Sequence, residues 1–143
     1  MGLDALQYVG GKSGRTALGK WVADRIPYGY YYCEPFAGML GVLLQRTRSP
    51  IEVVNDLNGH VTNWWEVVRD RTEELERWIT LTPDSRRTFY ASKAALETAT
   101  DPVERAGLFS YVLPNSLFVR GDTYRNATRP DKPWFNLLSL IHI

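Results

Sequence analysis

The chain has 143 residues, a length typical of one domain or of part of a larger one. Its hydrophobic content of 44% is enough for a core, and it contains neither a signal-peptide segment nor a run of about 20 apolar residues, so we expect a folded, soluble, cytoplasmic protein. The formal net charge of +1 excludes a general attraction to anionic partners and leaves only local basic clusters for nucleic-acid binding. The single cysteine, Cys33, excludes an internal disulfide and a Cys-based zinc site, and we expect it in a buried strand.

The residue pattern in the first half of the chain predicts a helix, a strand, a short helix and a second strand, in that order. Apolar residues with helical spacing, capped by Ser13, predict a helix over residues 14–26. A tyrosine-rich segment predicts a strand over residues 28–33, and an apolar run predicts a second, buried strand over residues 51–55. The segment between them, residues 40–46, predicts a short helix. This order predicts a β-α-β unit with parallel strands and a right-handed crossover.

The second half predicts mostly helices. Apolar residues on one face predict a long helix over about residues 59–80. Thr82-Pro83 and Asp101-Pro102 each place a capping side chain directly before a proline, which predicts the starts of two further helices. From Pro114 onward the periodicity is lost, which predicts loops or irregular structure.

Two glycines follow the first predicted strand, at the turn where an α/β sheet brings its backbone close to a ligand. These are Gly38 and Gly41, and Asp56 ends the second strand about 20 residues further on, the spacing of an acid that accepts hydrogen bonds from ribose hydroxyls. The ligand implied is adenosine-like, and the lack of a G-x-G-x-x-G pattern argues against a pyrophosphate. The alternative is that both glycines only allow tight packing of a strand against a helix.

A second glycine element, Tyr8-Val9-Gly10-Gly11-Lys12, precedes the first predicted helix. It combines an aromatic side chain that can stack, a permissive glycine pair and a cation at a helix entrance. Taken alone, it is either a phosphate-binding turn or an ordinary N-terminal loop.

Three motifs in this order carry a resemblance to a known family: YVGGK at residues 8–12, EPFAGMLGVLL at residues 34–44, and VVNDLN at residues 53–58, followed by NWWEVVRDR at residues 63–71. The chain resembles the amino-terminal half of the DNA adenine N6-methyltransferases of the Dam type, which include many phage-encoded members. The resemblance implies a Rossmann-like α/β methyltransferase fold, here with a partial sheet, and a helical DNA-recognition insertion. It also implies S-adenosylmethionine as the cofactor, double-stranded DNA as the partner, methyl transfer to N6 of adenine, no metal and a monomer.

The resemblance implies which residues hold the cofactor. They belong to the three motifs and are Tyr8, Gly10, Gly11, Lys12, Glu34, Pro35, Phe36, Ala37, Gly38, Gly41 and Asp56. The acid among them that follows the second strand is expected to bind the ribose. The stretch Gly38-Met39-Leu40-Gly41 departs from the family's commoner F-x-G-x-G pattern, so the contact that Gly41 makes with the cofactor is left open.

The expected DNA contacts lie in the irregular segment between Leu117 and Trp134, where four cations stand against two acids. Such a local excess suits phosphate contacts, and an aromatic side chain can stack at a base step. The residues expected to contact DNA are Arg120, Tyr124, Arg125, Arg129 and Lys132. A further basic cluster, at Arg86, Arg87 and Lys93, is either part of such a surface or an ordinary solvated face.

The family's catalytic motif, an acid or amide followed by Pro-Pro and an aromatic residue, does not occur in this sequence. We therefore expect no catalytic residue among the 143 positions and an inactive chain. Residues 138–143, LSLIHI, correspond to a translated transposon end used in sequencing libraries, and our hypothesis is a non-native tail on a truncated reading frame. The alternative is a genuine apolar strand. The expected regions are 1–69 for the cofactor, 70–137 for DNA recognition and 138–143 for the tail.

Two other functions stay open at this stage. The cofactor half of such a fold is shared by many enzymes, so a methyltransferase acting on RNA or on a small molecule is one alternative. The other is a non-catalytic product that binds the cofactor or DNA without turnover, which the missing Pro-Pro motif favours.

Overall fold

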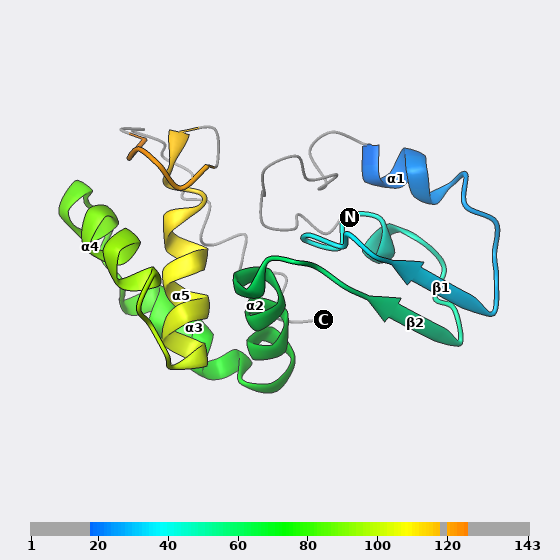
Figure 1. Cartoon of the computed structure of the whole chain (residues 1–143), viewed down its shortest axis with the longest axis horizontal. Coiled ribbons are helices and arrows are strands. Elements are labelled where there is room, and N and C mark those ends of the chain that lie inside the picture. The colour runs from blue at the N-terminus through cyan, green and yellow to red at the C-terminus, as the bar shows by residue number, and fades with distance from the viewer. Residues whose placement is uncertain (1–17, 118–119, 126–143) are drawn as a thin grey trace.

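The computed structural model describes residues 18–117 and 120–125. Its elements in chain order are α1 Leu18–Ala23, β1 Tyr31–Glu34, the 3₁₀ helix η2 Leu43–Gln45, β2 Ile51–Val54, α2 Gly59–Asp70, α3 Thr72–Leu81, α4 Arg86–Leu96 and α5 Pro102–Val112. Figure 1 shows the two strands and α1 at one end of the molecule, α3, α4 and α5 at the opposite end, and α2 between them. None of the helices in the described ranges is long and apolar enough to cross a membrane.

The two strands form a parallel pair, as the sequence predicts. Tyr31 lies opposite Ile51, and Glu34 lies opposite Val54. The pairing continues past both strands, because the Asn55 N–H donates to the Glu34 carbonyl at 2.9 Å. The carboxyl ends of β1 and β2 therefore stop side by side, and the segments that follow them begin from neighbouring points.

The strands are less buried than their apolar composition predicts. Cys33 is exposed, and in β2 the side chains of Ile51, Val53 and Val54 are 40%, 53% and 46% exposed. The predictions of a buried cysteine and a buried second strand were therefore wrong. The physical reason is that a pair of strands has two faces and two edges, and the described elements cover only part of them.

The short helix predicted over residues 40–46 was also wrong in type and extent. Only Leu43–Gln45 is helical, as one 3₁₀ turn, and the residues before it form turns. Leu40 has a φ of 53°, which lies in the left-handed region. A right-handed helix cannot pass through such a residue, so no regular helix can start at position 40.

The long helix predicted over residues 59–80 is two helices. α2 ends at Asp70, and α3 begins at Thr72, with Arg71 between them at φ −139° and ψ 40°. The apolar periodicity continues across this break because both helices pack against α5. The apolar periodicity therefore predicted which residues are buried, but it did not predict the break in the helix at Arg71.

One of the two predicted capping positions is confirmed. The Asp101 carboxylate accepts the Glu104 N–H at 2.8 Å, and Pro102 is the first residue of α5. Thr82 instead ends α3, in an extended conformation with ψ 114°, which is what a following proline favours. The cap of α4 is Ser85, whose hydroxyl accepts the Thr88 N–H at 2.9 Å.

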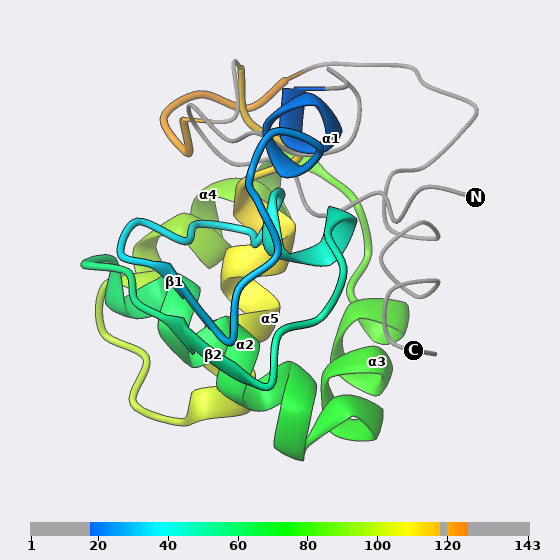
Figure 2. The same cartoon turned by 90° about the vertical axis from the view of Figure 1, so that its right-hand side faces the viewer.

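The core of the described residues lies in the helical group, where α2, α3 and α4 all contact α5 (Figures 1 and 2). Trp64, Leu75 and Phe89, one from each of these three helices, are fully buried. The Trp64 indole N–H donates to the Ser110 hydroxyl of α5 at 2.7 Å. This group is the platform on which the pocket described below is built, because α2 belongs to both.

Gly107 sets how closely α5 approaches α3. A Cβ atom at this position would lie 2.2 Å from the Trp78 ring. Gly107→Ala should therefore separate the two helices and lower the free energy of unfolding by about 1–3 kcal/mol, as overpacking typically does. The measurement is urea denaturation followed by circular dichroism.

Gly59→Ala is the matched control for this substitution. Position 59 is also helical, and a Cβ there meets nothing within 4 Å. Its alanine variant should be as stable as the parent or more stable by up to about 1 kcal/mol, because alanine favours the helix. Equal losses of stability in the two variants would contradict the packing argument.

Candidate functional site

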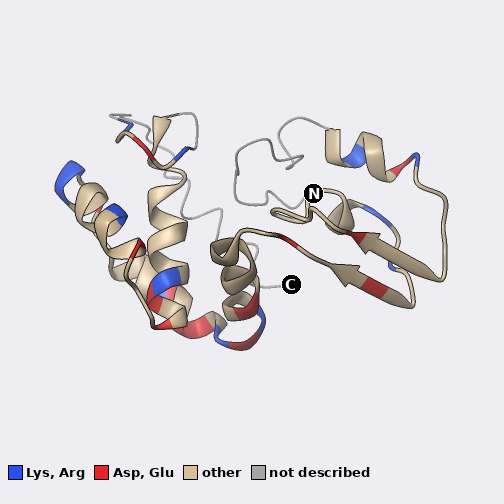
Figure 3. Cartoon of the chain, viewed as in Figure 1, with Lys and Arg blue, Asp and Glu red and all other residues tan. Residues whose placement is uncertain are grey.

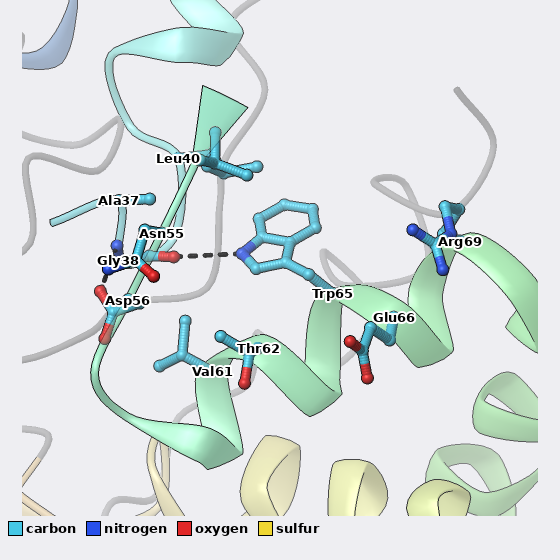
Figure 4. A pocket seen from close by; sticks show the side chains of 11 residues that line it. Ala37, Gly38, Leu40, Asn55, Asp56, Val61, Thr62, Trp65, Glu66 and Arg69 are labelled. Carbon is cyan, nitrogen blue, oxygen red and sulfur yellow. Dashed lines mark hydrogen bonds between the residues drawn. The ribbon is translucent and has the colours of Figure 1, made fainter. Parts of the chain in front are cut away.

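A pocket of about 410 Å³ lies where the carboxyl ends of β1 and β2 face α2 (Figure 4). Its walls come from the turn after β1, from the end of β2 and the residues after it, and from one face of α2. The lining residues are Ala37, Gly38, Leu40, Val54, Asn55, Asp56, Val61, Thr62, Trp65, Glu66 and Arg69.

Gly38 is held at both of its backbone polar atoms. Its N–H donates to Oδ2 of Asp56 at 2.8 Å, and its carbonyl accepts the indole N–H of Trp65 at 3.1 Å (Figure 4). Gly38 has a φ of 51°, a conformation that glycine adopts without the steric cost that a side chain imposes. Three segments of the chain, the turn after β1, the turn after β2 and α2, are joined at this one residue.

The carboxylate of Asp56 also orders the start of α2. Its Oδ1 accepts the Asn58 N–H at 2.9 Å, while Oδ2 accepts the N–H of Gly38. A carboxylate has about four lone-pair sites, so two remain for a ligand. Asp56 is partly buried and lines the pocket, so those sites are within reach of a bound molecule.

The turns after the two strands are further tied to each other by their backbones. The Ala37 N–H donates to the Asn55 carbonyl at 2.9 Å, and the Asn55 side-chain amide donates to the Pro35 carbonyl at 3.1 Å. These bonds fix the side of the pocket opposite α2. Small residues such as glycine and alanine leave the backbone open to a ligand there.

Only some of the cofactor-binding residues predicted from the sequence lie together at the pocket. Ala37, Gly38 and Asp56 line the pocket, whereas Glu34, Pro35, Phe36 and Gly41 do not. The expected site residues Tyr8, Gly10, Gly11, Lys12, Arg129 and Lys132, and the tail 138–143, lie outside the described residues.

The Glu34 carboxylate accepts a hydrogen bond from a neighbour in its own strand, β1. Its Oε1 accepts the Tyr32 hydroxyl at 2.6 Å, and the Arg46 guanidinium lies 3.7 Å above the Tyr32 ring. Burial, and after it the hydrogen bond with Glu34, raises the pKa of Tyr32 above its ordinary value. The tyrosine therefore stays protonated and serves as a fixed donor to the glutamate.

Sequence reasoning missed the contribution of α2 to the pocket. Thr62, Trp65, Glu66 and Arg69 recur at i, i+3, i+4 and i+7, which places them on one face of a helix. That spacing could have predicted that this face of α2 lines the site. It was missed because Trp65 also fits the apolar pattern of the buried face.

Leu40 adopts the backbone conformation that is expected of a glycine. Counted from Phe36, the family pattern F-x-G-x-G places its second glycine at position 40, and Leu40 has a φ of 53° there. Gly41 is not among the residues with positive φ. The strained position of this turn is therefore the leucine, whose side chain is only 8% exposed and forms part of the pocket wall.

The order of stability of two variants tests this conformation. Alanine costs about 1–2 kcal/mol in the left-handed region, which exceeds the entropic cost of glycine of roughly 0.5–1 kcal/mol. Leu40→Gly should therefore be more stable than Leu40→Ala, although both lose the buried side chain. Thermal denaturation of the two variants measures the difference.

The control is Ala91→Gly, an exposed position within α4. There the glycine variant should be less stable than the parent alanine, by about 1 kcal/mol. Alanine more stable than glycine at both positions would show that Leu40 is not held in the left-handed region in solution.

A second group of residues lies at the far end of the helical group, where α4 begins and α5 ends. The Tyr111 hydroxyl lies 3.1 Å from both Asp84 Oδ1 and the Ser85 carbonyl, so its one proton is shared between these two acceptors, and burial raises its pKa to about 12. The ring of Tyr124 packs on Phe89 with 5.4 Å between centroids, and its hydroxyl donates to Asp84 at 3.4 Å. Tyr124 thus anchors its loop on the core.

Basic residues of α4 and of the loop over residues 120–125 both lie at this end of the helical group (Figure 3). The Lys93 ammonium donates to the Asp122 carbonyl at 3.0 Å, which ties α4 to the loop. Arg86, Arg87 and Arg120 are exposed, and Arg125 is partly exposed. We call Arg86, Arg87, Lys93, Arg120 and Arg125 the basic surface. Within the described residues, none of the four arginines forms an ion pair.

No group of three or more His, Cys, Asp or Glu side chains that could hold a metal ion occurs in the described ranges. The pocket offers carboxylates, the Arg69 guanidinium, neutral polar side chains, backbone amides and apolar walls.

A pocket at the carboxyl ends of adjacent parallel strands is the usual ligand site of α/β proteins. The family model of the D12 class N6 adenine-specific DNA methyltransferases matches residues 8–129, and the chain belongs to that family. The resemblance found in the three motifs is thereby confirmed. The activity of the family is methylation of adenine at N6 in DNA, with DNA as the substrate and a methyl donor as the cofactor. No curated protein matches the chain.

The small parallel sheet and the helices agree with the predicted mixed α/β class.

Proposed function

We propose that the methyl donor is S-adenosylmethionine and that it binds in the pocket between the strand ends and α2. The observation that carries this proposal is the joint position of Gly38 and Asp56, which the parallel pairing of β1 and β2 brings into a 2.8 Å hydrogen bond. The pocket volume of about 410 Å³ lies within the range of small-molecule sites, roughly 300–1,000 Å³.

The chemistry of the walls suits this donor. S-adenosylmethionine has an adenosine and a cationic sulfonium amino acid but no phosphate, so it needs apolar surface, a ribose-binding acid and negative charge. Leu40, Val54 and Val61 offer apolar surface for the base, Asp56 offers free lone pairs for the ribose, and Glu66 adds a second carboxylate. Tyr8, Gly10, Gly11 and Lys12 are proposed to complete the site, and Glu34, Pro35, Phe36 and Gly41 to shape the turn around it.

Loss of the ribose-binding acid tests the cofactor assignment. Asp56→Ala should weaken S-adenosylmethionine binding about 10- to 100-fold, because a hydrogen bond to a charged group is worth roughly 1.5–3 kcal/mol. Isothermal titration calorimetry on the full chain measures the dissociation constant, at a temperature where circular dichroism shows both proteins folded.

Glu97→Ala is the matched control, because Glu97 is an exposed acid directly after α4 and does not line the pocket. Its affinity should equal that of the parent. Asp56→Ala binding with parental affinity would refute the assignment of the acid to the ribose.

We further propose that DNA lies across the basic surface. Five cations from two segments lie there beside two acidic residues, Asp84 and Asp122, so the local charge is positive although the chain as a whole is almost neutral. Arginines that form no ion pair with the described part of the chain can contact phosphates. Arg129 and Lys132 are proposed to extend this surface. The proposed organisation is a Rossmann-like cofactor region over residues 1–69, followed by a helical DNA-recognition region over residues 70–137.

The salt dependence of DNA binding tests this surface. Replacing both Arg86 and Arg87 by glutamine should weaken binding to an unmethylated duplex and reduce the slope of log K against log salt by about 1 for each phosphate that is no longer neutralised. Fluorescence anisotropy at several salt concentrations gives the slope.

Arg48→Gln serves as the control, because Arg48 is an exposed cation before the amino end of β2 and belongs neither to the pocket lining nor to α4. The control should keep the parental slope. A double variant with an unchanged slope would place the DNA elsewhere on the molecule.

A further inference from the structure

Two adjacent tryptophans of α2 donate their indole N–H groups to different parts of the molecule. Trp64 donates to the Ser110 hydroxyl of α5 at 2.7 Å and is fully buried. Trp65 donates to the Gly38 carbonyl at 3.1 Å and forms part of the pocket wall. Their rings meet edge to face, with 4.8 Å between the centroids. One tryptophan thus joins α2 to the helical core and the other joins it to the glycine turn.

We propose that Trp65 is a positioning residue for the methyl donor: its indole N–H holds the Gly38 carbonyl and so keeps the glycine turn in the shape that receives the cofactor. This inference rests on the proposed cofactor pocket and deepens it. Neither the glycine pattern nor the acid after β2 points to a residue of the following helix, so the assignment comes from the tertiary contact alone.

The physical argument concerns the freedom of a glycine. Gly38 populates both signs of φ at little steric cost, so the turn has more accessible conformations than it would with another residue. Asp56 restrains the N–H of Gly38, and Trp65 restrains its carbonyl on the other side. Without the indole donor, the peptide that follows Gly38 is free to rotate, and only a fraction of the molecules keep the binding shape.

The size of the effect follows from that fraction. The apparent dissociation constant of a ligand rises in proportion as the competent conformation becomes less populated. One neutral hydrogen bond shifts such an equilibrium by about three- to tenfold. A contact that only shaped the wall of the pocket would act through the buried area of the ring and would leave the backbone of Gly38 unchanged.

The two tryptophans allow a matched experiment on the full chain. Trp65→Phe and Trp64→Phe remove the same atoms and the same donor, from neighbouring residues of one helix. Trp65→Phe should bind S-adenosylmethionine about three- to tenfold more weakly than the parent by calorimetry. Trp64→Phe should bind within about twofold of the parent, although it should denature at a lower temperature because a buried hydrogen bond is removed.

A second measurement needs no ligand. In a chain labelled with ¹⁵N-glycine, the Gly38 amide should exchange with solvent faster in Trp65→Phe than in the parent, because the turn opens more often. Trp64→Phe should leave that amide at the parental rate. A purely structural role of Trp65 would accelerate exchange in both variants together or in neither.

The outcomes separate the two proposals. If the parent chain binds no S-adenosylmethionine, the proposed function fails, and this inference fails with it. If the parent binds and Trp65→Phe has the same affinity or the same Gly38 exchange rate, only the positioning role is overturned. Equal losses of affinity in Trp64→Phe and Trp65→Phe would also overturn it, because they would show a general disturbance of the helix rather than a local effect on the turn.

Discussion

The arrangement of the site depends on how Gly38 is held between Asp56 and Trp65. Its N–H and its carbonyl are bonded to side chains that lie 18 and 27 residues further along the chain. Both partners reach it only because β1 and β2 are parallel, which places the turns after them at one edge of the sheet, and because α2 starts directly after the second turn. The same carboxylate fixes the start of α2 through Asn58, so the pocket and the helix that lines it are set by a single group.

The two faces of α2 therefore have different roles. One face contributes Thr62, Trp65, Glu66 and Arg69 to the pocket, and the other packs Trp64 against α5. In a family of DNA adenine methyltransferases, the methyl donor and the adenine must meet in one geometry. A helix shared by the proposed cofactor pocket and the helical group gives the two parts a fixed relation, since it cannot shift toward one without altering its contacts with the other.

The basic surface is a product of folding rather than of composition. Arg86 and Arg87 begin α4, while Arg120 and Arg125 follow α5, more than thirty residues later in the chain. The packing of α4 against α5 brings these segments together, and Tyr111 and Tyr124 hold them through Asp84. A net charge of +1 gives no indication of this, because the acids of the described residues lie mostly on other elements.

The sequence by itself determined the parallel strands, the glycine turn with its acid, the Asp101 cap and membership of the family, because each depends on local spacing or on residue type. It did not determine the break at Arg71, since two helices that both pack against α5 keep one apolar period. Nor did it determine the left-handed Leu40, the exposed strands or the bond from Trp65 to Gly38. Those features depend on distances between residues remote in the chain, and only the tertiary structure decides such distances.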